Sequence, residues 1–114
     1  MDQPLRATVD EARQTPIAPG SRSAVLMQHG SMALRYYAPR GPDLQTPHEQ
    51  DEVYVVAAGR GTFVAGGRRV AFGPGDVLFA AAAVEHRFED FSADFATWVV
   101  FWGPTGGERE NPFP

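Results

Sequence analysis

Hydrophobic and polar residues alternate in short runs along most of the chain, and glycine or proline separates one run from the next. This pattern is typical of β-strands bounded by turns, and no segment has a long helical periodicity. The sequence therefore predicts an all-β domain of about eight strands. We expect these strands within 23–28, 31–38, 52–58, the TFVA and RRVAF segments around Gly66-Gly67, 77–82, 86–91 and 95–102.

Three further segments lack this alternation. Residues 1–22 contain three prolines and few large apolar side chains, which predicts an N-terminal arm or a short helix. Residues 39–47 also contain three prolines and no periodicity, and a loop of that length often has a functional role. Residues 104–114 are expected to form a C-terminal tail, so one domain is predicted over residues 23–103.

The composition narrows the chemistry that the chain can perform. Its 114 residues include no cysteine, and all ten basic residues are arginine. Without cysteine the chain has no disulfide, thiolate zinc site, iron–sulfur cluster or cysteine nucleophile. Without lysine it has no Schiff base and no phosphate-loop lysine. Three histidines, 14 carboxylates, hydroxyl groups and arginine remain for metal binding or catalysis.

The charge and the hydropathy pattern limit the partners. The net charge is −4 and the arginines are scattered, which argues against a nucleic-acid partner. No apolar run approaches the roughly 20 residues that span a bilayer, and the first residues lack the apolar core of a signal peptide. We therefore expect a soluble, cytoplasmic protein whose partner is a small molecule, with no nucleic acid and no membrane.

Strand alternation indicates which polar side chains share a face. Glu52 and Tyr54 have the same parity in one predicted strand, and His48 has it too if the alternation extends that far. His86 and Phe88 share a face in a later strand. If both polar sets point into the fold, then His48, Glu52 and His86 converge there.

Two imidazoles and one carboxylate form a ligand set that holds a divalent first-row metal and leaves coordination positions open for a substrate. The alternative interpretation is that His48 is a loop residue, Glu52 a solvated strand end and His86 a core histidine bonded to the backbone. Spacing alone leaves both interpretations open. Asp51 points to the opposite face, and we expect it to be solvated or to cap a turn.

Two segments resemble the paired motifs of the cupin family. The first contains His48, then Glu52 after three residues, then Gly59 after six more. The second is GDVLFAAAAVEHRFED at residues 75–90, which matches the second motif in register through His86. The resemblance covers about residues 23–103.

This resemblance implies an antiparallel β-barrel of the double-stranded β-helix or jelly-roll type, RmlC-like, with a short N-terminal arm. It also implies a divalent transition metal (Fe, Mn, Ni or Zn) held by His48, Glu52 and His86. Thr46 stands where the motif has its first histidine, so water, substrate or Gln50 is expected to complete the site. Small cupins commonly form homodimers, and the apolar strand 95–102 would contribute to the contact or lie buried as a central strand.

Two function classes follow from the resemblance. One is a metal-dependent dioxygenase or isomerase acting on a small oxygen-rich organic compound, in which Tyr54 or Tyr36 moves a proton. The other is a non-catalytic module that binds a small metabolite with weak or no metal binding. A sensing role would need a separate partner protein. A serine hydrolase is disfavoured because no Gly-x-Ser-x-Gly sequence occurs.

Overall fold

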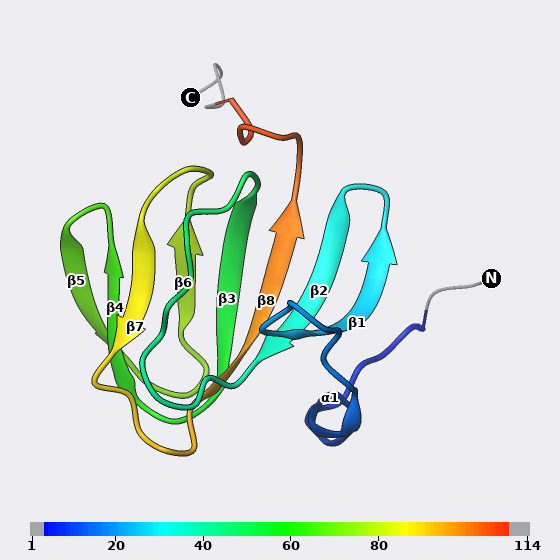
Figure 1. Cartoon of the computed structure of the whole chain (residues 1–114), viewed down its shortest axis with the longest axis horizontal. Helices are drawn as coiled ribbons and strands as arrows, with labels where there is room; N and C mark the ends of the chain where they lie inside the picture. Colours follow the sequence, from blue (N-terminus) through cyan, green and yellow to red (C-terminus); the bar gives the residue numbers. More distant parts are fainter. Residues whose placement is uncertain (1–3, 110–114) are drawn as a thin grey trace.

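A computed structural model of the chain describes residues 4–109, which form one short helix and eight strands (Figure 1). The all-β prediction is thereby confirmed. In chain order the elements are α1 (Val9–Gln14), β1 (Ala24–His29), β2 (Met32–Tyr37), β3 (Asp51–Ala58), β4 (Gly61–Ala65), β5 (Arg68–Phe72), β6 (Val77–Ala80), β7 (His86–Glu89) and β8 (Ala96–Trp102).

The strands form two antiparallel sheets. One sheet has the order β1-β2-β8-β3-β6, and the other has the order β5-β4-β7. Strands of both sheets contribute inward side chains to one core that is rich in aromatic rings. Its buried members are Tyr37, Tyr54, Val56, Phe63, Phe72, Leu78, Ala80, Phe88, Phe95 and Val99.

The alternation in β3 determines which of its side chains reach this core. Glu52, Tyr54 and Val56 are buried, whereas Val53 and Val55 lie on the opposite face and are only partly buried. β3 pairs with β8 on one side and β6 on the other. β8 also pairs with β2, so this most apolar strand is central in its sheet, which explains why both of its faces are apolar.

Two strand ends differ from the sequence prediction. The β1–β2 hairpin turns at Gly30-Ser31 rather than at His29-Gly30, because His29 still pairs with Met32. β6 ends at Ala80, two residues before the predicted end. Ala83 has a left-handed backbone with a φ of 66°, which is incompatible with continued strand geometry.

Helix α1 lies within the segment predicted to be an arm or a short helix. The hydroxyl of Thr8 caps it by accepting a hydrogen bond from the Glu11 N–H at 3.1 Å. Its one buried residue, Ala12, packs in a cluster with Tyr36 and Ala96 on the outer face of the larger sheet. Parts of the predicted arm and tail, residues 1–3 and 110–114, lie outside the described residues. Within residues 4–109 no helix is long and apolar enough to cross a membrane.

The turn between β3 and β4 depends on Gly59. Its φ of +87° lies in the left-handed region, which favours glycine. A Cβ atom at this position would lie 2.5 Å from the Cα of Phe95. Gly59 therefore permits a close backbone approach between this turn and the segment that leads into β8.

Candidate metal centre

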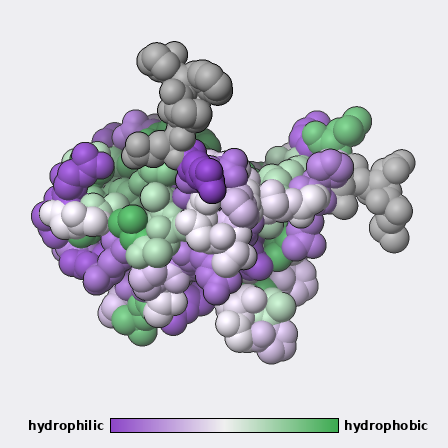
Figure 2. Space-filling view, turned by 90° about the horizontal axis from the view of Figure 1, so that it is seen from above, coloured by the Kyte–Doolittle hydropathy of each residue, from purple (hydrophilic) through white to green (hydrophobic). Residues whose placement is uncertain are grey.

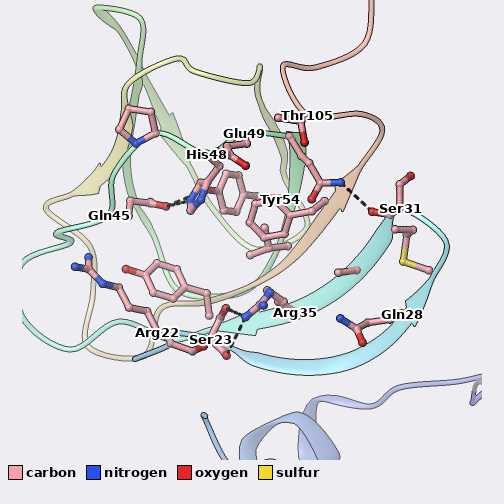
Figure 3. A pocket seen from close by; sticks show the side chains of 18 of the residues that line it. Arg22, Ser23, Gln28, Ser31, Arg35, Gln45, His48, Glu49, Tyr54 and Thr105 are labelled. Atoms are coloured by element: carbon pink, nitrogen blue, oxygen red, sulfur yellow. Dashed lines mark hydrogen bonds between the residues drawn. The ribbon is translucent and has the colours of Figure 1, made fainter. Parts of the chain in front are cut away.

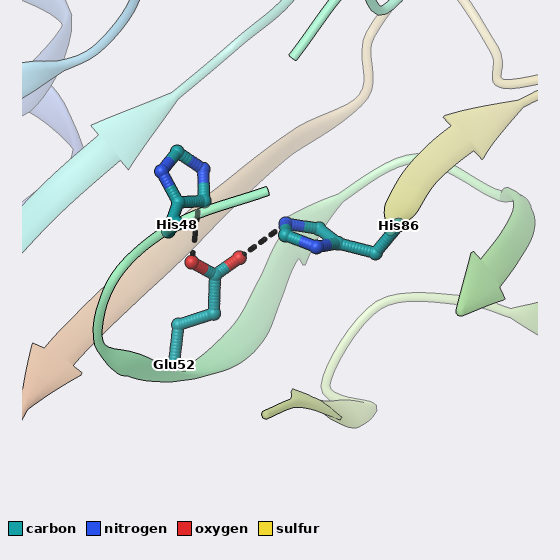
Figure 4. Close-up of side chains that lie close together, drawn as sticks. All are labelled: His48, Glu52 and His86. Carbon is teal, nitrogen blue, oxygen red and sulfur yellow. Dashed lines mark ion pairs between the residues drawn. The ribbon is translucent and has the colours of Figure 1, made fainter. Parts of the chain in front are cut away.

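His48, Glu52 and His86 come together at the end of the molecule where β3 and β7 begin (Figure 1, Figure 4). His48 lies in the loop before β3, Glu52 is the second residue of β3, and His86 is the first residue of β7. The group therefore joins the two sheets. Figure 2 looks onto this end of the molecule, where polar residues predominate along the margin and apolar residues lie between them.

One potential ligand atom from each of these three side chains lies within 4.8 Å of the other two. His86 Nε2 is 2.6 Å from one carboxylate oxygen of Glu52, and His48 Nε2 is 3.7 Å from the other. Glu52 and His86 are almost fully buried, whereas His48 is half-buried. The carboxylate thus lies between the two imidazoles, with Oε1 toward His86 and Oε2 toward His48.

The backbone fixes which nitrogen of His86 faces the site. Its Nδ1 lies 2.8 Å from the carbonyl oxygen of Val84, so Nδ1 carries the proton and donates it to that oxygen. In the neutral ring, Nε2 then presents a lone pair toward Glu52. A histidine ligand to a metal is usually oriented in this way by a backbone or carboxylate acceptor.

Within the described part of the chain, two buried polar atoms of this group lack a hydrogen-bond partner: Nε2 of His86 and Oε2 of Glu52. The 2.6 Å contact between Nε2 and Glu52 Oε1 is close, but its geometry is not that of a hydrogen bond. Orphaned buried polar atoms are costly, and the close approach of His86 Nε2 to Glu52 Oε1 requires a cation at this position. A proton or a metal ion meets that requirement, so the donor set fits a divalent metal.

The two histidines respond differently to these surroundings. Burial lowers the pKa of His86, but the contact with Glu52 and the bond to the Val84 carbonyl outweigh burial and raise it. Burial also lowers the pKa of His48, and there the nearby Glu52 does not compensate. His48 is therefore the more readily neutral imidazole, and His86 holds a proton more firmly when no metal is bound.

Tyr54 borders the same carboxylate. Its hydroxyl donates a hydrogen bond to Glu52 and also lies 3.4 Å from the side-chain oxygen of Gln45. Burial, followed by the negative charge of Glu52, raises the pKa of Tyr54 well above its usual value. The phenol therefore keeps its proton at physiological pH and donates it in the hydrogen bond to the Glu52 carboxylate.

Gln45 and Asp43 belong to the site, although the sequence did not single them out. Gln45 Oε1 lies 3.3 Å from His48 Nε2, while its Nε2 donates to Asp43 at 2.7 Å. Asp43 also accepts bonds from the Tyr37 hydroxyl and from the Phe88 N–H, which attaches the loop to β7. The amide of Gln45 is thus oriented with its oxygen toward His48. The length of the 39–47 loop was the sequence feature that pointed to this region.

Tyr36 lies outside the site, which corrects its selection as a proton-transfer residue. It packs edge-on against Trp98 on the outer face of the sheet, with ring centroids 5.1 Å apart. Tyr37 is the neighbour that points inward, because adjacent residues of a strand face opposite sides. The Tyr36 hydroxyl is buried and has no hydrogen-bond partner among residues 4–109, and Tyr36 does not line the pocket beside His48.

Three other positions near the motifs lie outside the group of three potential ligands, although Thr46 and Gln50 line the pocket. Thr46 is exposed. Gln50 donates hydrogen bonds to the carbonyl oxygens of Ser31 and Gly103, so its amide links the β1–β2 turn to the residue after β8. Asp51 is not solvated: it is 6% exposed, and its carboxylate accepts bonds from the N–H groups of Ala82 and Glu108. It therefore caps two backbone segments, in agreement with the turn-cap expectation.

A pocket of about 940 Å³ opens beside the three side chains (Figure 3). His48 and Tyr54 line it, whereas Glu52 and His86 contact these two residues from the buried side. Further walls come from the segment before β1, the β1–β2 turn, the inner faces of β2 and β8, and the loop before β3. This volume is sufficient for a small organic molecule next to the histidine–carboxylate group.

Comparison with known proteins agrees with this fold. Residues 33–102 match the family model described as Cupin domain. A protein of Streptomyces coelicolor that is named only as uncharacterized is 40% identical over 62 residues, which make up 54% of this chain. The match spans 59% of that relative's length.

Solved structures show the same architecture at low sequence identity. A cupin-2 domain protein of Shewanella frigidimarina superposes with a TM-score of 0.65 at 13% identity, over 87% of this chain and 95% of that one. An RmlC-like cupin from the same organism gives a TM-score of 0.63 at 15% identity, over 91% and 96% of the two chains. At these identities the similarity concerns the fold.

Proposed function

The chain belongs to the cupin family, and on this premise we propose that it binds a divalent transition metal through His48, Glu52 and His86. A small oxygen-rich organic ligand occupies the adjoining pocket. In this proposal the two sheets form the barrel typical of the family. The observation that carries the metal assignment is the pair of buried, unpartnered atoms, His86 Nε2 and Glu52 Oε2, next to the half-buried His48.

In this proposal each residue of the site has a different role. The bond from His86 Nδ1 to the Val84 carbonyl holds Nε2 in position, and the buried Glu52 supplies negative charge. A bound metal would polarise an oxygen of the ligand as a Lewis acid. Tyr54 holds a proton at the edge of the pocket, and it is the residue that we assign to proton movement in a dioxygenase or isomerase reaction.

Metal analysis of the purified protein tests this assignment. After incubation with Fe(II), Mn(II), Ni(II) or Zn(II) and removal of excess ion, the wild type is expected to retain one of them in equimolar amount. His48→Ala and His86→Ala should lose most of that metal, because each removes one of only three ligands. Elemental analysis by mass spectrometry provides the measurement.

His29→Ala is the matched control, because it removes the third histidine, which is exposed at the end of β1. This variant should retain metal at the wild-type level. Equal metal content in the wild type and in His86→Ala would show that the proposed ligands are wrong.

A specific observation favours a second candidate, the non-catalytic binding module. Thr46 occupies the position of the first motif histidine and is exposed, so it adds no buried ligand. In this alternative the same pocket holds a small metabolite and the metal is weakly bound or absent. Wild-type protein that retains no metal in the experiment above would favour this candidate.

A further inference from the structure

Arg22 and Arg35 line the pocket next to the proposed metal centre (Figure 3). Arg35 is half-buried in β2, opposite Val99 of β8, and Val99 is in turn opposite Tyr54 of β3. These three residues therefore form one row across the inner face of the larger sheet. The Arg35 guanidinium shares this face, and hence the pocket, with Tyr54.

Neither arginine has an acidic partner within residues 4–109. Arg35 Nη1 contacts only the Ser23 carbonyl oxygen at 3.4 Å and the Ser23 hydroxyl at 3.2 Å, both of which are neutral. By contrast, Arg69 and Arg87 on the outer surface both pair with Glu89. Arg87 is also half-buried but pairs with Glu89, so among the described residues Arg35 is the half-buried arginine whose charge no acid balances.

The buried Glu52 and the partly buried Asp43 near the pocket are already engaged by other groups. Asp43 accepts hydrogen bonds from Tyr37, from Gln45 and from the backbone of Phe88. Glu52 accepts from Tyr54 and faces the two histidines. Glu49 also lines the pocket, but it is exposed. The positive charge of Arg35 is therefore left for a ligand.

We propose that the pocket ligand is a small organic acid whose carboxylate binds Arg35, with Arg22 adding positive charge at the rim. This inference rests on the proposed function, because it names the chemical class of the ligand expected there. A carboxylate accepts charge-assisted hydrogen bonds from the planar guanidinium, and the contact with Ser23 holds that group in place beforehand. A second oxygen of the same acid would face His48.

Calorimetric titration tests the proposal with two acids and their neutral amides: lactate against lactamide, and malonate against malonamide. Wild-type protein should bind each acid more tightly than its amide. Arg35→Gln should weaken binding of both acids by roughly tenfold to a hundredfold, because it removes a charged hydrogen-bond partner. Arg35→Lys keeps the charge but loses the planar geometry, so its affinity should lie between those of Arg35→Gln and the wild type.

Arg69→Gln is the matched control, because it removes an arginine outside the pocket, and its affinity for the acids should equal that of the wild type. Thermal unfolding and metal content, measured on the same samples, verify that Arg35→Gln remains folded and loaded. Binding of the acids that is equal in Arg35→Gln and the wild type, or absent from the wild type, would overturn the proposal. Binding to metal-depleted protein that depends on Arg35 would support it even if the metal assignment failed.

Discussion

At the scale of single residues, the environment of one carboxylate organises the site. Glu52 is fully buried and lies between His86, His48 and Tyr54. The same carboxylate therefore influences the pKa values of all three groups. The effect on His86 is a raised pKa, and the effect on Tyr54 is a phenol that keeps its proton. Because His86 contacts this buried acid, the protonation of His86 is coupled both to the stability of the fold and to metal binding.

The raised pKa of His86 predicts how the metal-free protein responds to pH. A histidine whose pKa is higher when folded stabilises fully below its unfolded value of 6.5, and this stabilisation is lost as pH rises through the folded pKa. We therefore expect the free energy of unfolding of the wild type minus that of His86→Asn to be largest below pH 6.5 and to decrease as the pH rises above it. Urea unfolding in the presence of a chelator measures it.

The lowered pKa of His48 makes its own contribution to stability change with pH in the opposite direction. Subtracting the unfolding free energy of His86→Asn from that of the wild type limits this contribution, because both proteins contain His48. Metal affinity should change the other way and increase with pH, because the metal and the proton compete for Nε2 of His86. A difference in unfolding free energy that is constant or increases with pH would contradict the assigned protonation of His86.

The limits of sequence inference are also visible at this scale. Parity along the strands grouped Glu52 with Tyr54 and His86 with Phe88, because side chains alternate within a strand, and the motif resemblance added the expectation that Glu52 and His86 converge. The same rule explains the error at Tyr36, which was chosen for its hydroxyl group and not for its parity. Gln45 was missed because an irregular loop has no period, so the direction of its side chain depends on the bonds of Asp43.

At the scale of elements, the strands were largely predictable and their ends were not. The two strands around Gly66-Gly67 match their predicted segments because the turn residues and the alternation agree. The end of β6 was misplaced because the run of alanines there has no alternation, and the chain leaves the strand where Asp51 accepts the N–H of Ala82. Tertiary contacts of this kind leave no local pattern in the sequence.

Gly59 gives a test of one such close contact. Gly59→Ala should destabilise the protein by about 3 kcal/mol or more, because it combines left-handed backbone strain with a clash against the backbone of Phe95. Gly75→Ala is the matched control: Gly75 has a similar φ of +86°, but a Cβ there meets nothing within 4 Å. Its cost should be only about 1–2 kcal/mol. Equal costs in chemical denaturation would refute the close-approach role of Gly59.

At the scale of the whole molecule, the outer face of the larger sheet is only partly covered. Helix α1 packs near Tyr36 and Ala96, at one part of the face. On β6 at the sheet edge, Val77 is 64% exposed and lies opposite Val55 of β3, and Phe79 is 55% exposed and lies opposite Val53. We call these four residues the outer strip. A contiguous apolar surface of this kind favours contact with another protein surface, and the expected homodimer would bury it.

Phe79→Glu should therefore convert a dimer into a monomer, because it places a charge in the centre of the outer strip. Size-exclusion chromatography with light scattering measures the mass. Val70→Glu serves as the control, because Val70 is comparably exposed on β5 in the other sheet. A monomeric wild type, or a Phe79→Glu variant that remains dimeric, would exclude this interface.

The position of the site between the two sheets has a mechanical consequence. Glu52 belongs to one sheet and His86 to the other, and no backbone ladder joins these sheets within residues 4–109. Whatever cation lies between the two side chains therefore acts as a cross-link that closes a long segment of chain. Exchanging a proton for a metal would change how often the sheets separate, so backbone amides of β3 and β7 would report occupancy of the site through their hydrogen-exchange rates.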